Sequence, residues 1–233
     1  MEKNILYLGL KAGGAPVMWQ RIFLTALPKI KELVPPGSHV LEVGYGDGLL
    51  TCWLCKNLGW NMLGLDMSQE CFLSAKENSC RLGIENSADF ICCNPEETWK
   101  HIGQYDAVFI KTVLYNAKNI EEYNKWLKWI ISVLKPGGVL INFETGRANS
   151  FMQAYRKIRK RIYTDLCLYN KVVERLYDTC FYIVDRRYYG GWSQFLSRIP
   201  FFYYLAYSLE ENMRVRHADN CFAVSIIAQK PWN

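Results

Sequence analysis

Glycines and carboxylates share one short loop of this sequence. The run Glu42-Val-Gly44-Tyr-Gly46-Asp47-Gly48 places a glycine at every second position between residues 44 and 48. Because glycine has no Cβ atom, such a loop lets the backbone approach a ligand closely. The spacing is one residue shorter than the dinucleotide fingerprint, and the carboxylates of Glu42 and Asp47 would repel a pyrophosphate. Opposite charges attract strongly in a partly desolvated cleft, so the loop favours a ligand with a cationic end.

A further carboxylate, Asp66, follows a short apolar segment about 20 residues after the glycine loop. In open parallel sheets, a carboxylate at this place accepts hydrogen bonds from both hydroxyl groups of a ribose. The loop and Asp66 are therefore a consistent pair, provided that both stand at the ends of neighbouring strands.

The elements that must hold these residues alternate between strand and helix. Strands are expected at 39–43, 62–65, 89–93, 105–110 and 139–143, and helices at 18–34, 49–58, 68–82 and 120–134. Such alternation requires a parallel sheet covered on both faces. A closing hairpin is expected from strands at 213–216 and 222–229. The fold class is therefore α/β: a doubly wound, mainly parallel seven-stranded sheet, Rossmann-like, with an antiparallel last strand and a ligand crevice at the carboxyl ends.

The excess positive charge of the chain, +6 in total, is confined to one segment. Residues 151–200 hold 10 of the 28 Lys and Arg, 4 of the 22 Asp and Glu, and 11 of the Phe, Trp and Tyr residues. We expect one domain over residues 1–233, with a helical segment at 1–35 and a helical, basic and aromatic cap at 151–208 inserted between strands five and six. Arginines such as Arg186 and Arg187 would bind an anionic acceptor or lipid surface. A solvated face is the alternative.

Length and composition describe one ordinary folded domain. The chain has 233 residues, of which 50% are hydrophobic and 21% charged, which excludes intrinsic disorder. The longest apolar stretches are shorter than the roughly 20 residues that a membrane-spanning helix needs. The apolar segment near the start of the sequence is too short for a signal peptide. Nine cysteines without framework spacing, including Cys52 and Cys55, are expected to be reduced core residues and to bind no metal. A cytoplasmic location is expected.

Four motifs resemble those of the class I S-adenosylmethionine-dependent methyltransferases, in particular the small-molecule, type 11-like subgroup. They are the glycine loop, Asp66, the segment Tyr105-Asp-Ala-Val-Phe-Ile-Lys-Thr-Val-Leu-Tyr-Asn116, and the turn Leu134-Lys-Pro-Gly-Gly138. The resemblance covers residues 36–145 and the last strand, which is about half of the chain. It implies a methyltransferase whose cofactor, S-adenosylmethionine, supplies the cationic sulfonium and ammonium groups.

The resemblance also implies residues that bind this cofactor. Asp66 would hold the ribose, and Met67 would pack on the adenine. Asn94 stands where the family usually has an Asp that meets the adenine amino group, and its side-chain oxygen can accept the same hydrogen bond. The implied cofactor-binding residues are Glu42, Gly44, Gly46, Asp47, Gly48, Asp66, Met67, Asn94 and Lys111.

The methyl acceptor is open at this point. We expect transfer to an oxygen or nitrogen of a small molecule, anionic or lipid-linked, and peripheral membrane contact is one alternative. Such an acceptor needs a base near neutral pKa, for which Glu144, Tyr115 and His217 are the candidates by position. Nucleic acid is disfavoured, because the Asn/Asp-Pro-Pro-aromatic run and the Pro-Cys nucleophile of its methylating enzymes are missing. The competing hypothesis is a non-catalytic Rossmann-like scaffold or docking protein. The sequence leaves the oligomeric state open.

Overall fold

Seven strands form one sheet in the computed structural model, which describes residues 16–93, 103–147, 153–154, 168–190, 205 and 215–232. The strands are β1 (His39–Val43), β2 (Asn61–Asp66), β3 (Ala88–Cys92), β4 (Tyr105–Lys111), β5 (Leu134–Thr145), β6 (Tyr182–Tyr189) and β7 (Ala223–Gln229). The helical elements are α2 (Pro16–Leu33), α3 (Leu49–Leu58), α4 (Gln69–Leu82), η1 (Leu114–Asn116), α6 (Ile120–Val133), α8 (Lys171–Cys180) and η3 (Ala218–Asn220).

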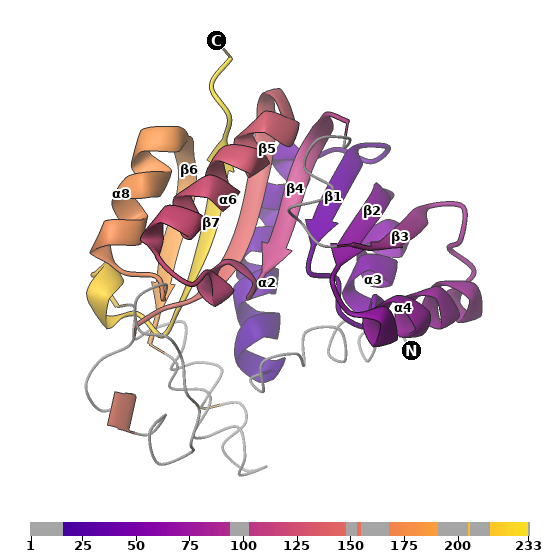
Figure 1. Cartoon of the computed structure of the whole chain (residues 1–233), viewed down its shortest axis with the longest axis horizontal. Coiled ribbons are helices and arrows are strands. Elements are labelled where there is room, and N and C mark those ends of the chain that lie inside the picture. Colours follow the sequence, from indigo (N-terminus) through magenta and orange to yellow (C-terminus); the bar gives the residue numbers. More distant parts are fainter. Residues whose placement is uncertain are drawn as a thin grey trace.

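The strand order is β3-β2-β1-β4-β5-β7-β6. The first five strands of the chain pair in parallel, whereas β7 runs antiparallel to both β5 and β6. The expected fold class is thus confirmed. The carboxyl ends of the parallel strands meet along one edge of the sheet (Figure 1). Of the two antiparallel-paired strands, β7 lies inside the sheet and β6 forms its edge.

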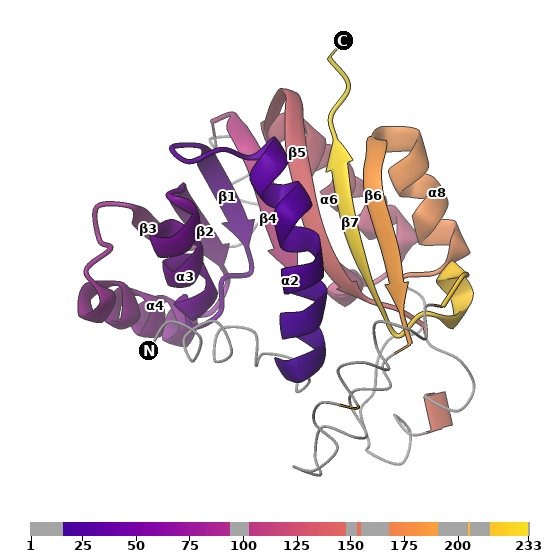
Figure 2. The same cartoon turned by 180° about the vertical axis from the view of Figure 1, so that it is seen from behind.

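Helices cover both faces of the sheet, as a parallel sheet requires. Figures 1 and 2 show α2, α3 and α4 on one face and α6 and α8 on the other. On the first face, the ring of Phe23 packs edge-on against Phe109 and Phe143, with centroid distances of 6.5 and 6.0 Å. On the second face, the hydroxyl groups of Tyr123 and Tyr177 lie 3.0 Å apart and join α6 to α8. The two apolar cores fix the sheet from both sides.

Polar residues stabilise the ends of several elements. Ser68 caps α4 and Asn119 caps α6 through side-chain oxygens that accept backbone N–H groups. At the amino-terminal ends of the parallel strands, Oδ2 of Asp106 accepts the N–H of His39 at 2.8 Å. Oδ1 of Asp106 lies 2.6 Å from Nζ of Lys135. Asp106 therefore ties β1, β4 and the start of β5 together.

The expected cap at 151–208 is wrong for residues 168–190. This stretch forms α8 and β6, which continue the helical cover and the sheet. Val215 and Arg216, expected in the sixth strand, belong to no strand. The strand β6 was not predicted, because the charged run Asp185-Arg186-Arg187 interrupts its apolar pattern. A half-buried edge strand tolerates such charges. The rest of the expected cap, apart from residues 153–154 and 205, lies outside the described residues.

The two arginines proposed to bind an anionic acceptor are engaged within the fold. Nη1 of Arg186 lies 3.3 Å from Oε1 of Glu174, and its Nη2 pairs with Asp178, so Arg186 joins β6 to α8. Nε of Arg187 lies 2.9 Å from a carboxylate oxygen of Asp185. We expected these two arginines to bind the acceptor, whereas the structure shows both in ion pairs at the edge strand β6, far from β1.

The described cysteines are free thiols. Cys52 and Cys55 lie on the buried face of α3, and burial raises the pKa of both thiols to about 12, so their expected role as core residues is confirmed. Among the described residues, no group of three or more His, Cys, Asp or Glu side chains is arranged to hold a metal ion. None of the helices in the same parts of the chain is both long and apolar enough to cross a bilayer.

Candidate functional site

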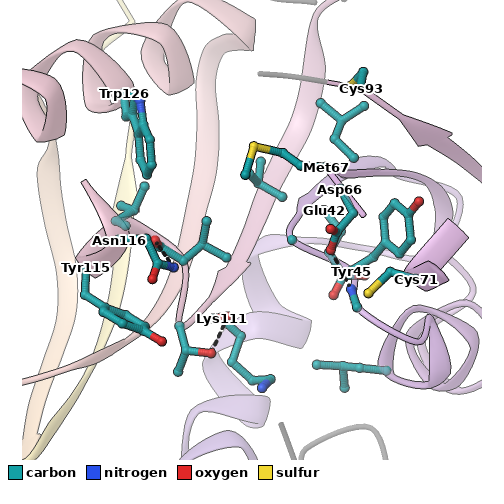
Figure 3. A pocket seen from close by; sticks show the side chains of 18 of the residues that line it. Glu42, Tyr45, Asp66, Met67, Cys71, Cys93, Lys111, Tyr115, Asn116 and Trp126 are labelled. Carbon is teal, nitrogen blue, oxygen red and sulfur yellow. Dashed lines mark hydrogen bonds between the residues drawn. The ribbon is translucent and has the colours of Figure 1, made fainter. Parts of the chain in front are cut away.

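A cavity of about 830 Å³ opens at the carboxyl ends of β1, β2 and β4, the edge at which such a sheet binds ligands. Figure 3 shows Tyr45 and Asp66 on the side of β1 and β2, and Tyr115 and Trp126 on the side of η1 and α6. The sequence-predicted site residues that line this cavity are Glu42, Gly44, Gly46, Asp47, Asp66, Met67, Lys111 and Tyr115.

The glycine loop and Asp66 form one hydrogen-bonded unit. Oδ2 of Asp66 accepts the N–H of Gly46 at 2.9 Å, and Oδ1 accepts the N–H of Ser68 at 3.1 Å. The φ angle of Gly46 is +57°, and a Cβ atom added there would meet nothing within 4 Å. The backbone at Gly46 therefore faces open space beside a carboxylate that is fixed at the end of β2.

The other two loop glycines are needed for packing. A Cβ atom at Gly44 would lie 2.4 Å from Cγ2 of Val113, and one at Gly48 would lie 2.7 Å from Cβ of Ala75. Gly48 does not line the cavity; it starts α3 with a φ of 71° and lets α3 approach α4. The expected cofactor contact of Gly48 is thus corrected to a contact between helices.

Charged groups of both signs are buried at the base of the loop. Glu42 is 2% exposed and accepts the hydroxyl of Thr51 at 2.5 Å. Lys111 is 8% exposed, with its ammonium 5.9 Å from the centre of the Trp19 ring. Burial raises the pKa of Glu42 to about 7 and lowers the pKa of Lys111 to about 8, and their mutual attraction opposes both shifts. With Asp47 at the exposed end of the loop, this half of the cavity is strongly polar.

The chain leaves β4 through a strained turn that lines the cavity. Thr112 has a φ of 55°, in the left-handed region that β-branched residues rarely adopt. Its N–H donates to the carbonyl of Phe143 at 2.8 Å. Behind the turn, Glu144 is fully buried: Oε2 accepts the N–H of Leu114 at 3.0 Å and Oε1 that of Thr145 at 2.9 Å. These bonds hold a conformation that would otherwise relax.

Glu144 does not line the cavity, so its expected role as a base that touches the acceptor is corrected. Instead it holds η1, the turn that carries Tyr115 and Asn116. Burial raises the pKa of the Glu144 carboxyl to about 7, and hydrogen bonds from backbone N–H groups of residues 113–115 and 145 oppose that rise. Glu144 is therefore a positioning residue for the cavity wall.

We expect Glu144→Gln to loosen η1 and leave the sheet folded. The new NH2 group meets backbone N–H donors, so the free energy of unfolding should fall by about 1 to 3 kcal/mol. Amide hydrogen exchange at residues 113–115, followed by mass spectrometry, should become faster. The pKa of Glu144 rises from 4.5 to about 7 on folding, so wild-type stability should decrease as pH rises through this range. In the Glu144→Gln variant, the stability should decrease less over this pH range, because residue 144 no longer titrates.

The control for this variant is Glu122→Gln. Glu122 is a solvent-accessible carboxylate that also accepts a backbone N–H, that of Lys118. Its replacement should change neither exchange at residues 113–115 nor the pH dependence. Equal behaviour of the two variants would contradict the assigned role of Glu144.

The other site residues predicted from the sequence differ in whether they line the cavity. His217 is exposed, precedes η3 and does not line the cavity. It was expected at the end of a strand, but residues 215 and 216, the described part of that stretch, belong to no strand, so the position that suggested a catalytic role is not supported. Asn94 lies outside the described residues, and its contact with an adenine stays a prediction. Of the three candidate bases, Tyr115 lines the cavity.

The second half of the cavity is apolar and aromatic, and sequence reasoning missed it. Trp126, Trp129 and Ile130 of α6 line it, together with Leu114 of η1. No charged side chain from α6 or η1 is among the described lining residues. A signal was present, because Trp126 and Ile130 are one helical turn apart. We call this half the aromatic chamber.

Residues 40–138 match a protein family described as "Methyltransferase domain". The match runs from β1 to the turn within β5 and includes the glycine loop, Asp66, Lys111 and Tyr115. Residues 40–138 are therefore similar to a methyltransferase domain. The resemblance noted in the four sequence motifs is thereby confirmed, and the cofactor of this class is S-adenosylmethionine.

Two proteins with similar sequences are named methyltransferases. "Ubiquinone/menaquinone biosynthesis C-methyltransferase UbiE" of Rickettsia typhi is 26% identical over 148 residues, which are 61% of this chain and 56% of that protein. "Demethylmenaquinone methyltransferase" of Bacillus cytotoxicus is 30% identical over 148 residues, 62% of this chain and 60% of that protein. The chain therefore spans less than two thirds of the length of these relatives.

Solved structures share the fold. The cyclase SpnF aligns with a TM-score of 0.64 and 19% identity, covering 92% of this chain and 83% of that one. A protein from Methanosarcina mazei, described as one of the "SAM-dependent methyltransferases", aligns with a TM-score of 0.61 and 20% identity over 88% of this chain and 98% of that one. Because one fold carries different chemistries, this likeness supports the architecture, and the function is argued from the site.

Proposed function

We propose that this chain transfers a methyl group from S-adenosylmethionine to a small-molecule acceptor. The observation that carries the proposal is the charge arrangement of the polar half of the cavity. Glu42 and Asp47 suit the ammonium of the cofactor, Lys111 suits its carboxylate, and Asp66 suits the two ribose hydroxyls. The open space at Gly46 lets the methionine part lie against the loop backbone. The residues present therefore fit the cofactor group by group.

Bound S-adenosylmethionine supplies an electrophilic methyl group. The chain must place a lone pair of the acceptor in line with that methyl group and exclude water, which requires orientation more than covalent catalysis. Met67 would pack against the adenine, while the aromatic chamber would receive the acceptor. Tyr115 lines the cavity on a turn that Glu144 holds, and it is the candidate base: its ionised phenolate would accept the proton that the acceptor loses and become the neutral hydroxyl.

The atom that receives the methyl group is part of the proposal. We expect oxygen or nitrogen, but the two similar proteins quoted above make carbon a direct competitor, since one is named a C-methyltransferase. A product made with cofactor carrying a ¹³C-labelled methyl group decides between them. The carbon chemical shift of that group separates O-, N- and C-methyl products.

Cofactor binding should release protons near neutral pH. The pKa of Glu42 is about 7 in the free protein, and a cationic ligand beside its carboxyl favours the charged form, so binding lowers that pKa. Titration calorimetry at pH 7 in buffers of different ionisation enthalpy measures the release. We expect the dependence on buffer to diminish in Glu42→Gln. Equal dependence in wild type and variant would show that Glu42 does not sense the cofactor.

A non-catalytic scaffold remains the competing hypothesis, and one experiment separates the two. The protein is incubated with a metabolite extract and S-adenosylmethionine carrying a labelled methyl group, and products are found by mass spectrometry. If the protein is a methyltransferase, a labelled product should form with the wild-type protein and be absent with the Asp66→Ala variant. A scaffold would bind the cofactor and yield no labelled product. The same experiment identifies the acceptor.

A further inference from the structure

The hydroxyl group of Thr51 contacts the cavity only through another residue. Thr51 lies in the first turn of α3 and is completely buried. Its Oγ1 donates a hydrogen bond to Oε2 of Glu42 at 2.5 Å, which joins α3 to β1. Glu42 lines the cavity, whereas Thr51 is not among the described lining residues. Any effect of Thr51 on a ligand in the cavity must therefore pass through the Glu42 carboxylate.

The bond from Thr51 occupies one of the two oxygens of Glu42. The other oxygen, Oε1, has no hydrogen-bond partner among the described residues, and it is not one of their fully enclosed polar atoms. Because Glu42 lines the cavity, a ligand there can reach Oε1. An ionised carboxylate only accepts hydrogen bonds, so Oε1 suits a donor such as an ammonium group.

The charge of Glu42 depends on the same bond. Burial disfavours the ionised carboxylate and raises its pKa to about 7, and the Thr51 hydroxyl opposes this rise more than the ammonium of Lys111 does. Without the hydroxyl, the Glu42 carboxyl would be mostly protonated at neutral pH. The charged and titratable groups around Glu42 are Lys111 of β4, Asp47 of the loop, Asp66 of β2, and the thiols of Cys52 and Cys55 of α3.

We propose that Thr51 is a positioning residue for the cofactor: its hydroxyl keeps the Glu42 carboxylate ionised and leaves Oε1 to accept the ammonium group of S-adenosylmethionine. This inference rests on the proposed function, which places that ammonium beside Glu42 and Asp47. A protonated Glu42 would carry no charge to attract the ammonium. Thr51 therefore sets the pH range in which the empty site is ready for the cofactor.

Two ligands separate this role from a general effect on the loop. S-adenosylhomocysteine carries the ammonium group, whereas 5′-methylthioadenosine has the same adenosine and a thioether but lacks the amino acid part. Titration calorimetry measures both affinities between about pH 6 and pH 9, a range that brackets the pKa of Glu42. The proteins compared are wild type, Thr51→Val, which has nearly the same shape and no hydroxyl, and Thr51→Ser, which keeps the hydroxyl.

The expected deficit of Thr51→Val depends on pH. Loss of a charge-assisted hydrogen bond should raise the pKa of Glu42 by about one unit. S-adenosylhomocysteine should then bind Thr51→Val about 10-fold more weakly than wild type at pH 6 and about 5-fold more weakly at pH 7. The deficit should nearly vanish at pH 9, where Glu42 is ionised in both proteins. We expect 5′-methylthioadenosine to bind both proteins equally, and Thr51→Ser to behave like wild type.

A double variant and a second substitution complete the test. In the Glu42→Gln background, Thr51→Val should cause no further pH-dependent loss, because residue 42 no longer titrates. Thr51→Ala also lacks the hydroxyl and should reproduce the pH-dependent deficit with a smaller side chain.

Three results would overturn the assignment: an unchanged affinity of Thr51→Val for S-adenosylhomocysteine, a loss that is equal at every pH, or a loss that 5′-methylthioadenosine shares. If wild type binds no S-adenosylhomocysteine, the proposed function itself fails. If wild type binds it and only the pH-dependent deficit is missing, the role of Thr51 alone fails.

Discussion

Replacing Asp66 with alanine should weaken the binding of S-adenosylmethionine about 10- to 150-fold, the effect of losing charged hydrogen bonds worth about 1.5 to 3 kcal/mol. Asp66 lies at the end of β2 and lines the cavity. Its Oδ2 already accepts the N–H of Gly46, so the variant also loses the bond that fixes the loop. Titration calorimetry measures the affinity directly.

Two further variants give this prediction its controls. Asp66→Asn keeps one accepting oxygen and loses the charge, so its affinity should lie between those of wild type and Asp66→Ala. Asp89→Ala removes a carboxylate from the neighbouring strand β3, where Asp89 is 69% exposed and pairs with Lys76 outside the cavity. That variant should bind like wild type. Similar losses for Asp66→Ala and Asp89→Ala would show a general effect of charge rather than a ribose contact.

Gly46→Val should abolish measurable cofactor binding while the protein still folds. The added side chain would fill the open space beside the loop, where the cofactor has to approach the backbone. Because the φ of Gly46 is +57°, the substitution also strains the backbone by about 1 to 2 kcal/mol. A thermal melt measures that strain, and calorimetry measures the loss of binding.

Gly83→Val is the matched control for this strain. Gly83 follows α4 with a φ of +65°, and a Cβ atom there also meets nothing within 4 Å, but it does not line the cavity. Both variants should therefore lose similar stability, and only Gly46→Val should lose cofactor binding. Normal binding by Gly46→Val would place the cofactor elsewhere.

The parallel part of the sheet could be predicted because its signals are local. Each apolar strand is followed by a turn and an amphipathic helix, and residues such as Ser68 cap the helices. The strand β6 could not be found in this way. Its run Asp185-Arg186-Arg187 breaks the apolar pattern, and the partners that satisfy those charges, Glu174 and Asp178, come from α8. Tertiary contacts decide the conformation there.

For the site, position along the chain predicted the strand ends at which the cavity opens, but it did not predict the direction of individual side chains. Glu42, Asp66 and Lys111 line the cavity as expected. Glu144 also stands near a strand end, but its side chain reaches under η1 and is fully buried. Trp126 was missed because an apolar helix face looks the same in sequence whether it meets the core or a cavity. Both distinctions depend on packing.

A crystal structure of the protein with S-adenosylhomocysteine tests the central claim most directly. We expect one ligand in the cavity, with its ribose hydroxyls on the carboxylate of Asp66, its amino acid part along the backbone at Gly46, and its carboxylate on the side of Lys111. The sulfur should face the aromatic chamber. A ligand bound elsewhere, or an unchanged cavity at saturating ligand, would contradict the proposed cofactor site and the function built on it.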